Sequence, residues 1–349
     1  MKIVKFLAKC ILASLPLLAV VIFAAANPMC YMDEEYPAWR YTMDTVDNAG
    51  CGADVLILGD SRAMADLIPE VISGELLGDE SAAIENLAVG GATTIEMYCF
   101  LERYLEHNEA PETAVVMFAP FHYSYIDNYK TRTTYFNALT LPQLIRLLKD
   151  AKEAELKISA ASHAPDDLSA SYCAVKFEDY IPYTISARLF MPDVYLPAML
   201  NARLIGRKSL NTAAYDNLRA SHGQGYFGTL DGCSDAAYEA SYTQMSEDDN
   251  AYLLKSYADR LLKLLYDNGV KVILAQPPMN ETTYDSLDKN YVNQYREYIT
   301  TLCEAYDNVI FEDMPQRYDN EYFGDASHLN EKGAVKFSKE FAEKYAGIL

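Results

Sequence analysis

Short apolar runs alternate with segments of helical periodicity along most of this chain, and this alternation is its strongest constraint on the fold. The runs have the length of buried strands, and four of the five end at or near glycine or proline. Strands that alternate with helices predict a parallel sheet covered by helices on both faces. We therefore expect an α/β fold, a three-layer α/β/α sandwich with a mostly parallel sheet. The predicted strands are residues 54–58, 83–89, 113–119, 270–275 and 308–311.

Helical spacing of apolar residues follows most of these runs. Within residues 63–77, Pro69 predicts a break or a new helix start, because proline has no N–H to donate. Thr93 or Thr94 is a candidate N-cap for a helix that runs to about His107. Further helices are predicted over residues 141–156, 248–266, 287–306 and 330–345.

The N-terminus carries an export signal. Three lysines precede an uncharged run over residues 10–32, and three acidic residues follow it, so the rest of the chain is expected outside the cytoplasm. The run is long enough to span a bilayer as a signal-anchor helix. A cleaved signal peptide is the second interpretation, because the apolar centre at residues 11–23 is short and Ala24-Ala25-Ala26 resembles a cleavage site. The chain is then either a single-pass membrane protein or a secreted one.

These patterns divide the chain into three parts. Residues 1–32 form the signal-anchor or signal peptide, residues 33–52 a juxtamembrane connector, and residues 53–349 the main domain. Within that domain, residues 157–247 contain scattered Pro, Gly, Ser and Tyr with weak periodicity. We interpret this stretch as an insertion of short helices and loops that serves as a lid or a partner surface.

Charge and motif spacing exclude several classes of function. The chain has 29 basic and 50 acidic residues, a net charge of −21, which argues against a nucleic-acid partner. No cysteine and histidine cluster has zinc-ligand spacing, and no glycine pattern matches a dinucleotide fingerprint. We therefore expect neither a metal nor an organic cofactor.

Two short motifs predict chemistry. An apolar run enters Gly59-Asp60-Ser61, which presents a serine hydroxyl at a strand-to-helix turn, and Asp325-Ala326-Ser327-His328 supplies a base with its orienting acid. Ser61, His328 and Asp325 then form a nucleophile, base and acid set for acyl chemistry. Taken separately, Ser61 is also a suitable helix cap, and Asp325 and His328 also suit an ordinary loop.

Residues after the second and third strands are expected at the same edge as Ser61, because function in parallel sheets gathers at the carboxyl ends of the strands. Gly90 and Gly91 follow the second strand, and His122 follows the third. A glycine N–H approaches a substrate oxyanion closely. The predicted oxyanion hole is the N–H of Ser61 with that of Gly90 or Gly91, although an ordinary turn explains the two glycines equally well.

With these motifs the chain resembles the SGNH/GDSL hydrolase superfamily, whose flavodoxin-like fold it would share. The resemblance implies Ser61 as nucleophile, a glycine as oxyanion donor, and the Asp325–His328 pair as acid and base. The third block of that superfamily, Gly-x-Asn-Asp, is absent: the third strand here ends in Ala119-Pro120-Phe121-His122-Tyr123. Either His122 or Asn128 replaces its asparagine, or the site serves something other than fast hydrolysis, since losing one oxyanion donor costs about 10²–10³ in rate.

The layout of anchor, exported domain and altered third block also resembles the D-alanine transfer proteins of teichoic-acid modification and related membrane-anchored SGNH proteins. That resemblance implies a membrane-bound O-acyltransferase partner and a cell-envelope polymer as substrate. We therefore expect an exported serine enzyme that transfers an O-acyl group, acetyl above all, to or from an envelope glycan. Two alternatives stay open: a plain esterase or lipase, and a non-catalytic accessory or binding module for a membrane-bound O-acyltransferase.

Overall fold

The computed structural model describes residues 5–6, 9–16, 19, 27–30, 32–50, 52–77, 83–125, 136–162, 206–227, 232 and 234–349. Asn128, much of the predicted insertion and much of the predicted membrane segment lie outside these residues. Within the described ranges, no helix combines the length and the apolar character needed to cross a bilayer.

The centre of the fold is a five-stranded sheet in the order β2-β1-β3-β4-β6, and every pair of neighbours is parallel. This is the flavodoxin-like order, in which the strand sequence reverses between β1 and β3. The α/β class and the parallel sheet are thus confirmed. The strands are β1 (Val55–Gly59), β2 (Ile84–Asn86), β3 (Thr113–Met117), β4 (Lys271–Ala275) and β6 (Val309–Phe311), and a separate parallel pair joins β5 (Met279–Asn280) to β7 (Arg317–Tyr318).

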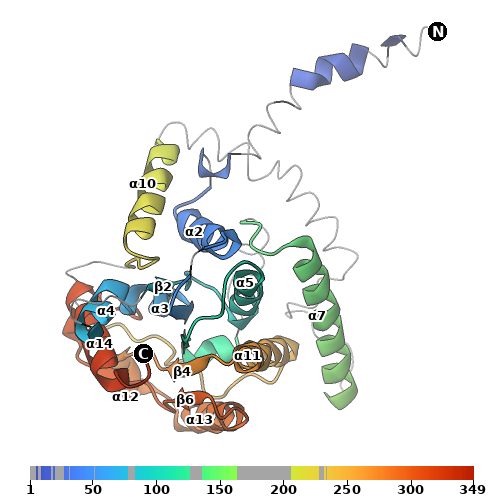
Figure 1. Ribbon diagram of the computed structural model, residues 1–349. Helices are drawn as coiled ribbons and strands as arrows, with labels where there is room; N and C mark the ends of the chain where they lie inside the picture. The colour runs from blue at the N-terminus through green and yellow to red at the C-terminus, as the bar shows by residue number, and fades with distance from the viewer. Residues whose placement is uncertain are drawn as a thin grey trace.

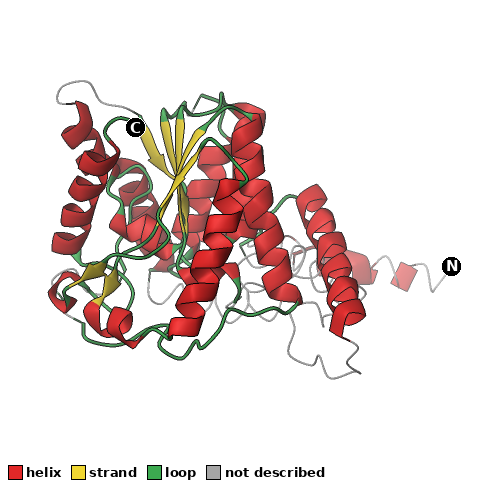
Figure 2. Ribbon diagram, turned by 90° about the horizontal axis from the view of Figure 1, so that it is seen from below, coloured by secondary structure: helices red, strands yellow, loops and turns green. Residues whose placement is uncertain are grey.

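Helices cover both faces of the sheet (Figures 1 and 2). Successive residues of a strand point to opposite faces, so Leu56 and Leu58 belong to one core cluster and Val55 and Ile57 to another. The first cluster is completed by α2 (Tyr36–Asp47), α5 (Thr94–His107), α11 (Asp249–Asp267) and α13 (Lys289–Glu304); the second by α3 (Ser61–Asp66), α4 (Pro69–Leu77) and α14 (Glu331–Tyr345).

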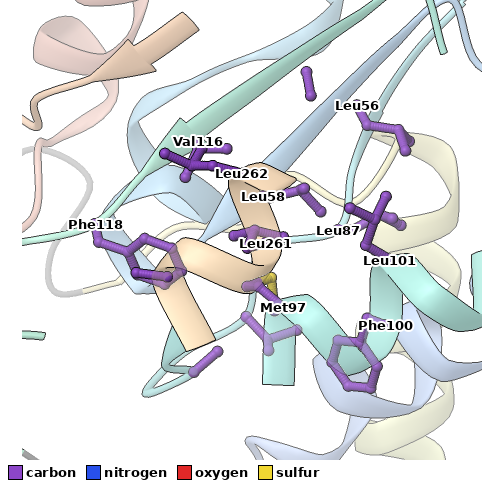
Figure 3. Packing of buried hydrophobic residues seen from close by; sticks show 14 of the residues in the cluster. Leu56, Leu58, Leu87, Met97, Phe100, Leu101, Val116, Phe118, Leu261 and Leu262 are labelled. Carbon is purple, nitrogen blue, oxygen red and sulfur yellow. The ribbon is translucent and has the colours of Figure 1, made fainter. Parts of the chain in front are cut away.

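The first cluster is densely packed (Figure 3). Side chains from β1 and β3 lie against α5 and α11, and none of those labelled in the figure is more than 2% exposed. Burying apolar side chains of this size contributes about 1.5–3 kcal/mol each. This packing holds the strands whose carboxyl ends carry the candidate site; its labelled members are Leu56, Leu58, Leu87, Met97, Phe100, Leu101, Val116, Phe118, Leu261 and Leu262.

Side-chain caps set the starts of several helices. Thr93 caps α5 through a capping box with Glu96. Asp248, Asp288 and Asn330 each accept an N–H in the first turn of α11, α13 and α14. These starts lie within one or two residues of the predicted ones, and α4 begins at Pro69, where a new start was predicted.

Residues 33–52, predicted to be a juxtamembrane connector, differ from that expectation. They contain α2, whose Trp39 and Val46 are fully buried in the core. Trp39, Met43 and Val46 are spaced four and three residues apart, which places them on one helix face. This segment is therefore part of the domain, and α2 packs against α5 and against α10 (Arg207–Ala220).

Residues 157–247, predicted to be an insertion within the domain, are described in part, and that part packs against other elements of the domain. α7 (Leu141–Ser162) extends beyond the predicted end at residue 156, and α10 packs on α2. After α10, the carbonyl of His222 accepts the N–H of Asn86 at 2.9 Å, and Gly225 donates to the carbonyl of Met64 at 3.2 Å. The chain that follows α10 is thereby fixed beside β2 and α3.

If α2 is part of the core, Trp39→Ala lowers the free energy of unfolding by about 3–5 kcal/mol, because a large buried ring is lost. The indole N–H of Trp39 has no hydrogen-bond partner among the described residues, so the loss is one of packing. Chemical denaturation measures it. Arg40→Ala on the same helix removes an exposed ion pair with Asp44 and a hydrogen bond to Tyr36, and it serves as the control, with an expected loss below about 1 kcal/mol. Equal, small losses in both variants would contradict a core role for α2.

Candidate active site

The site lies at the carboxyl ends of β1 and β3, at the point where the strand order reverses. β1 ends at Gly59, Asp60 caps α3, and Ser61 is the first residue of that helix. A Cβ at Gly59 would stand 2.0 Å from the carbonyl oxygen of Met117 and 2.6 Å from the Cβ of Ala63. Only glycine therefore lets β1 turn into α3 this close to β3, and that turn positions Ser61.

The structure brings the three predicted catalytic residues into one hydrogen-bonded line. Ser61 Oγ lies 2.8 Å from His328 Nε2, and His328 Nδ1 lies 2.8 Å from Asp325 Oδ2. Asp325 Oδ1 also accepts the backbone N–H groups of Ser327 and His328, each at 2.8 Å. The turn from Asp325 to His328 thus aims the imidazole at a hydroxyl 267 residues earlier in the chain.

Charge and hydrogen bonding keep Asp325 ionised. Half-burial alone would raise its pKa, but the hydrogen bond and charge of His328 and two backbone N–H groups lower the pKa well below its usual value. An ionised Asp325 accepts a hydrogen bond from the N–H at His328 Nδ1. The other ring nitrogen, Nε2, is then unprotonated and can accept the hydrogen bond of the Ser61 hydroxyl. The arrangement has the protonation pattern that a serine nucleophile needs.

A second imidazole and carboxylate pair lies beside Ser61. His122, in the 3₁₀ turn η2 (Pro120–Tyr123) after β3, hydrogen-bonds through Nδ1 to Asp60. Asp60 is fully buried and also accepts the N–H of Arg62 at 2.8 Å and of Ala119 at 2.9 Å. Burial would raise the pKa of Asp60, but the charge and hydrogen bond of His122 lower it to about 2. His122 Nε2 is then the ring nitrogen left to serve the pocket.

Arg62 forms a buried ion pair with Glu239, at 2.7 Å, and the two side chains are 4% and 0% exposed. Tyr291 donates to the other carboxylate oxygen at 3.2 Å. Burial raises the pKa of Glu239, whereas for Arg62 the neighbouring carboxylates outweigh burial and raise the pKa. Removing one member of such a pair costs about 3–5 kcal/mol, so the pair fastens the chain around residue 239 to the site.

A buried aspartate supports the turn that carries His328. Asp66, at the end of α3, accepts the N–H of Leu329 at 3.1 Å, and Ser338 of α14 donates to the carbonyl of Asp66 at the same distance. Burial raises the pKa of Asp66 well above its usual value. The residue after His328 is therefore anchored to the helix that begins with Ser61.

These groups enclose a small pocket of about 130 Å³. Its lining contains Ser61, His328 and His122 together with Gly91, whose φ of +71° suits glycine. At about 30 Å³ per water molecule, it has room for roughly four waters, which is the size of a small acyl group. The remaining lining residues are Asp60, Arg62, Thr93, Phe121, Tyr238 and Ser327.

Gly90 also lies next to Ser61. A Cβ at Gly90 would be 3.9 Å from that of Ser61 and 3.1 Å from the ring of Phe227. Phe227 in turn stacks on the His328 imidazole, with ring centroids 4.8 Å apart and an interplanar angle of 26°. Both predicted glycines are thus at the site, and an aromatic wall that was not predicted covers His328.

The structure places His122 in the pocket, whereas Asn128, the other candidate third donor, lies outside the described residues. Asp60, Arg62, Phe227 and Glu239 were not predicted as site residues. The position of Asp60 and Arg62 on either side of Ser61 could have suggested them, but Phe227 and Glu239 lie in a stretch without periodicity. Among the described residues, no group of three His, Cys, Asp or Glu side chains could hold a metal ion.

Comparison with known proteins gives one family match. The family model described as DltD protein, the D-alanine transfer protein of teichoic-acid modification, matches residues 240–346. The match begins ahead of α11, ends at the residue after α14, and includes Asp325 and His328, but not Ser61. It confirms the resemblance to this family over the C-terminal part of the chain. No curated protein matches the chain.

The low pKa of Asp60 predicts a pH dependence of stability. A pKa of about 2 in the fold, against an ordinary 3.8, stabilises the fold above pH 4, and this contribution is lost as the pH falls from about 4 to 2. Its size is about 2 kcal/mol. The loss of unfolding free energy between pH 5 and pH 2 should be smaller by that amount in Asp60→Asn, measured by denaturation at both pH values. Asp313→Asn, which alters an exposed carboxylate, should behave like the wild type. If Asp60→Asn lost as much unfolding free energy between pH 5 and pH 2 as the wild type does, the low pKa assigned to Asp60 would be contradicted.

Proposed function

We propose that this protein is an exported serine enzyme of the SGNH type that transfers a small O-acyl group to or from a cell-envelope polymer. The observation that carries the proposal is the hydrogen-bonded line from Ser61 through His328 to Asp325. The family match adds the substrate class, because the matched family is that of D-alanine transfer in teichoic-acid modification. An alanyl or acetyl group suits the volume of the pocket.

The chemistry follows the usual order for a serine nucleophile. His328 Nε2 takes the proton from Ser61 as Oγ attacks the acyl carbonyl, and Asp325 stabilises the imidazolium that forms. The N–H of Ser61 and that of Gly90 or Gly91 face the oxyanion. The leaving group then takes the proton from His328, and a serine ester remains. A second hydroxyl, or water, then attacks the ester carbonyl and gives its proton to His328. His328 returns that proton to Ser61 Oγ as the ester bond breaks.

His122 is the proposed third oxyanion donor, in place of the missing asparagine. Its ring lines the pocket and its Nδ1 is occupied by Asp60, which leaves Nε2 to donate a hydrogen bond when the ring is protonated. A protonated imidazole is a stronger hydrogen-bond donor than a neutral amide.

The N-terminal segment and the family match support a place at the membrane. We propose that residues 1–32 anchor the chain, or direct its export, and that the domain lies outside the cytoplasm. A membrane-bound O-acyltransferase is the proposed partner that supplies the acyl group. A plain esterase of the same fold would use the same residues but pass the acyl group to water only.

Fluorophosphonate labelling tests for an activated serine without knowledge of the substrate. We expect the full-length chain to be labelled, and the label to disappear in Ser61→Ala and in His328→Ala, because both groups are needed to activate the hydroxyl. Ser327→Ala is the matched control: this serine also lines the pocket, but its hydroxyl faces His328 Nδ1, which Asp325 occupies. A folded wild-type chain that takes no label would contradict the enzyme and favour a binding module.

The role of His122 predicts a selective loss of turnover. With a small acetate ester, His122→Ala should lower kcat by about 10²–10³ with little change in KM, because the lost donor acts mainly on the transition state. His122→Asn restores a donor amide and should recover part of that loss. Steady-state kinetics of the three proteins measure this. A His122→Ala variant with unchanged kcat, or one affected only in KM, would assign the third donor to another group.

A further inference from the structure

An exposed tyrosine borders the mouth of the catalytic pocket. Among the described residues that line the pocket, Tyr238 is the exposed one, with 37% of its surface accessible to solvent, whereas the others are buried or half-buried. Ser61 and His328 belong to the half-buried group. Tyr238 therefore stands where a molecule from solvent enters the site.

Two buried side chains support the Tyr238 ring from the interior. The guanidinium carbon of Arg62 lies 5.8 Å from the ring centroid, and the ring of Phe121 meets that of Tyr238 edge to face, with centroids 5.6 Å apart and an interplanar angle of 74°. Arg62 and Phe121 are only 3% and 6% exposed. The exposed part of the Tyr238 ring therefore faces away from both of them, toward solvent.

The backbone on both sides of Tyr238 is fixed. The N–H of Tyr238 donates to Thr283 Oγ1 at 3.0 Å, and the side-chain amide of Asn280 donates to the carbonyl of Ala236 at the same distance. The next residue, Glu239, has a φ of +64°, which a residue with a side chain rarely adopts. Backbone conformations of this kind persist where the surroundings hold them, and they cluster at sites that bind or react. The buried Glu239 side chain and the exposed Tyr238 ring are thus held on opposite sides of the chain.

The size of the pocket leaves the acceptor of the acyl group outside it. At about 130 Å³, the pocket holds a small acyl group on Ser61 and little more. The hydroxyl that attacks the serine ester gives its proton to His328 and so lies within hydrogen-bond reach of Nε2. On the side of Gly90, the ring of Phe227 stacks on the imidazole and covers it. The unit that carries the attacking hydroxyl must therefore lie at the mouth, beside Tyr238.

We propose that the exposed part of the Tyr238 ring binds a sugar ring of the acceptor polymer, one hydroxyl of which takes the acyl group. The C–H groups on the face of a sugar ring carry partial positive charge and pack on the negative face of an aromatic ring. A rigid sugar ring also loses less conformational freedom on binding than an open-chain polyol does. The contact involves a single sugar, so it suits a polymer whose sugars are joined through phosphates as well as a neutral glycan. This inference rests on the proposed function and names the unit that is acylated.

The transfer step balances within the site. The sugar hydroxyl attacks the carbonyl carbon of the Ser61 ester, and its proton passes to His328 Nε2. The bond between that carbon and Ser61 Oγ then breaks, and the proton passes from His328 to Oγ. The products are the acylated sugar and the free serine.

The test measures how the acetyl group on Ser61 divides between a sugar and water. The full-length chain receives p-nitrophenyl acetate as donor, with glycerol or the methyl pyranoside of glucose, galactose or N-acetylglucosamine as acceptor at equal concentration. Release of p-nitrophenol above that of Ser61→Ala counts all acetyl groups, and mass spectrometry counts those on the acceptor. The ratio of transfer to hydrolysis does not depend on how fast the serine ester forms. For the best glycoside it should exceed that for glycerol at least about fivefold, because glycerol has no ring face to stack.

Variants of Tyr238 separate the aromatic face from the bulk of the side chain. Tyr238→Ala should lower the ratio for that glycoside about tenfold, because the stacked face is lost, and should not lower the ratio for glycerol. Tyr238→Phe keeps the face and should retain most of the wild-type ratio. Tyr238→Leu, which keeps apolar bulk without the face, repeats the test should Tyr238→Ala fold poorly. Tyr252→Ala on α11 is the matched control, because Tyr252 is also 37% exposed but is not among the lining residues.

The outcomes distinguish this inference from the proposed function. An unchanged glycoside ratio in Tyr238→Ala and Tyr238→Leu would overturn the role of Tyr238, as would a wild-type ratio that is no higher for any glycoside than for glycerol. Release of p-nitrophenol without transfer to any acceptor would overturn it too and would leave a serine esterase. If the chain released no p-nitrophenol and took no fluorophosphonate label, the proposed function would fall together with the sugar site.

Discussion

One buried carboxylate ties together the segments that form the catalytic edge. Asp60 accepts the N–H of Arg62 in the first turn of α3, the N–H of Ala119 after β3, and the ring N–H of His122. Without it, the helix that begins with Ser61 would lose its cap, and the end of β3 would lose its link to the end of β1. The position of Ser61 and the orientation of the His122 imidazole therefore depend on the same two oxygen atoms.

The other acidic residues of the site act in the same way, each fixing one side chain. Asp325 orients His328, Glu239 holds Arg62, and Asp66 supports the residue after His328. The chain has a net charge of −21, so the placement of its carboxylates near the site matters. Each of these carboxylates is held against a neighbouring side chain or backbone N–H. A free carboxylate facing the pocket would instead repel a negatively charged oxygen there. Burial raises the pKa of Asp66 more than the nearby charge of Arg62 lowers it, so the neutral form is favoured in this buried position.

The parts of the fold that the sequence predicts are those with a local signal. Apolar runs bounded by glycine or proline located the strands of the main sheet, and Thr93, Asp248 and Asn330 marked helix starts through their own side chains. The alternation of strands and helices also placed Ser61 and His122 at one edge. α2 was missed because its apolar residues follow the uncharged N-terminal run and resemble a connector. Glu239 and Phe227 were missed because their partners, Arg62 and His328, lie far away in the sequence and no local pattern marks them.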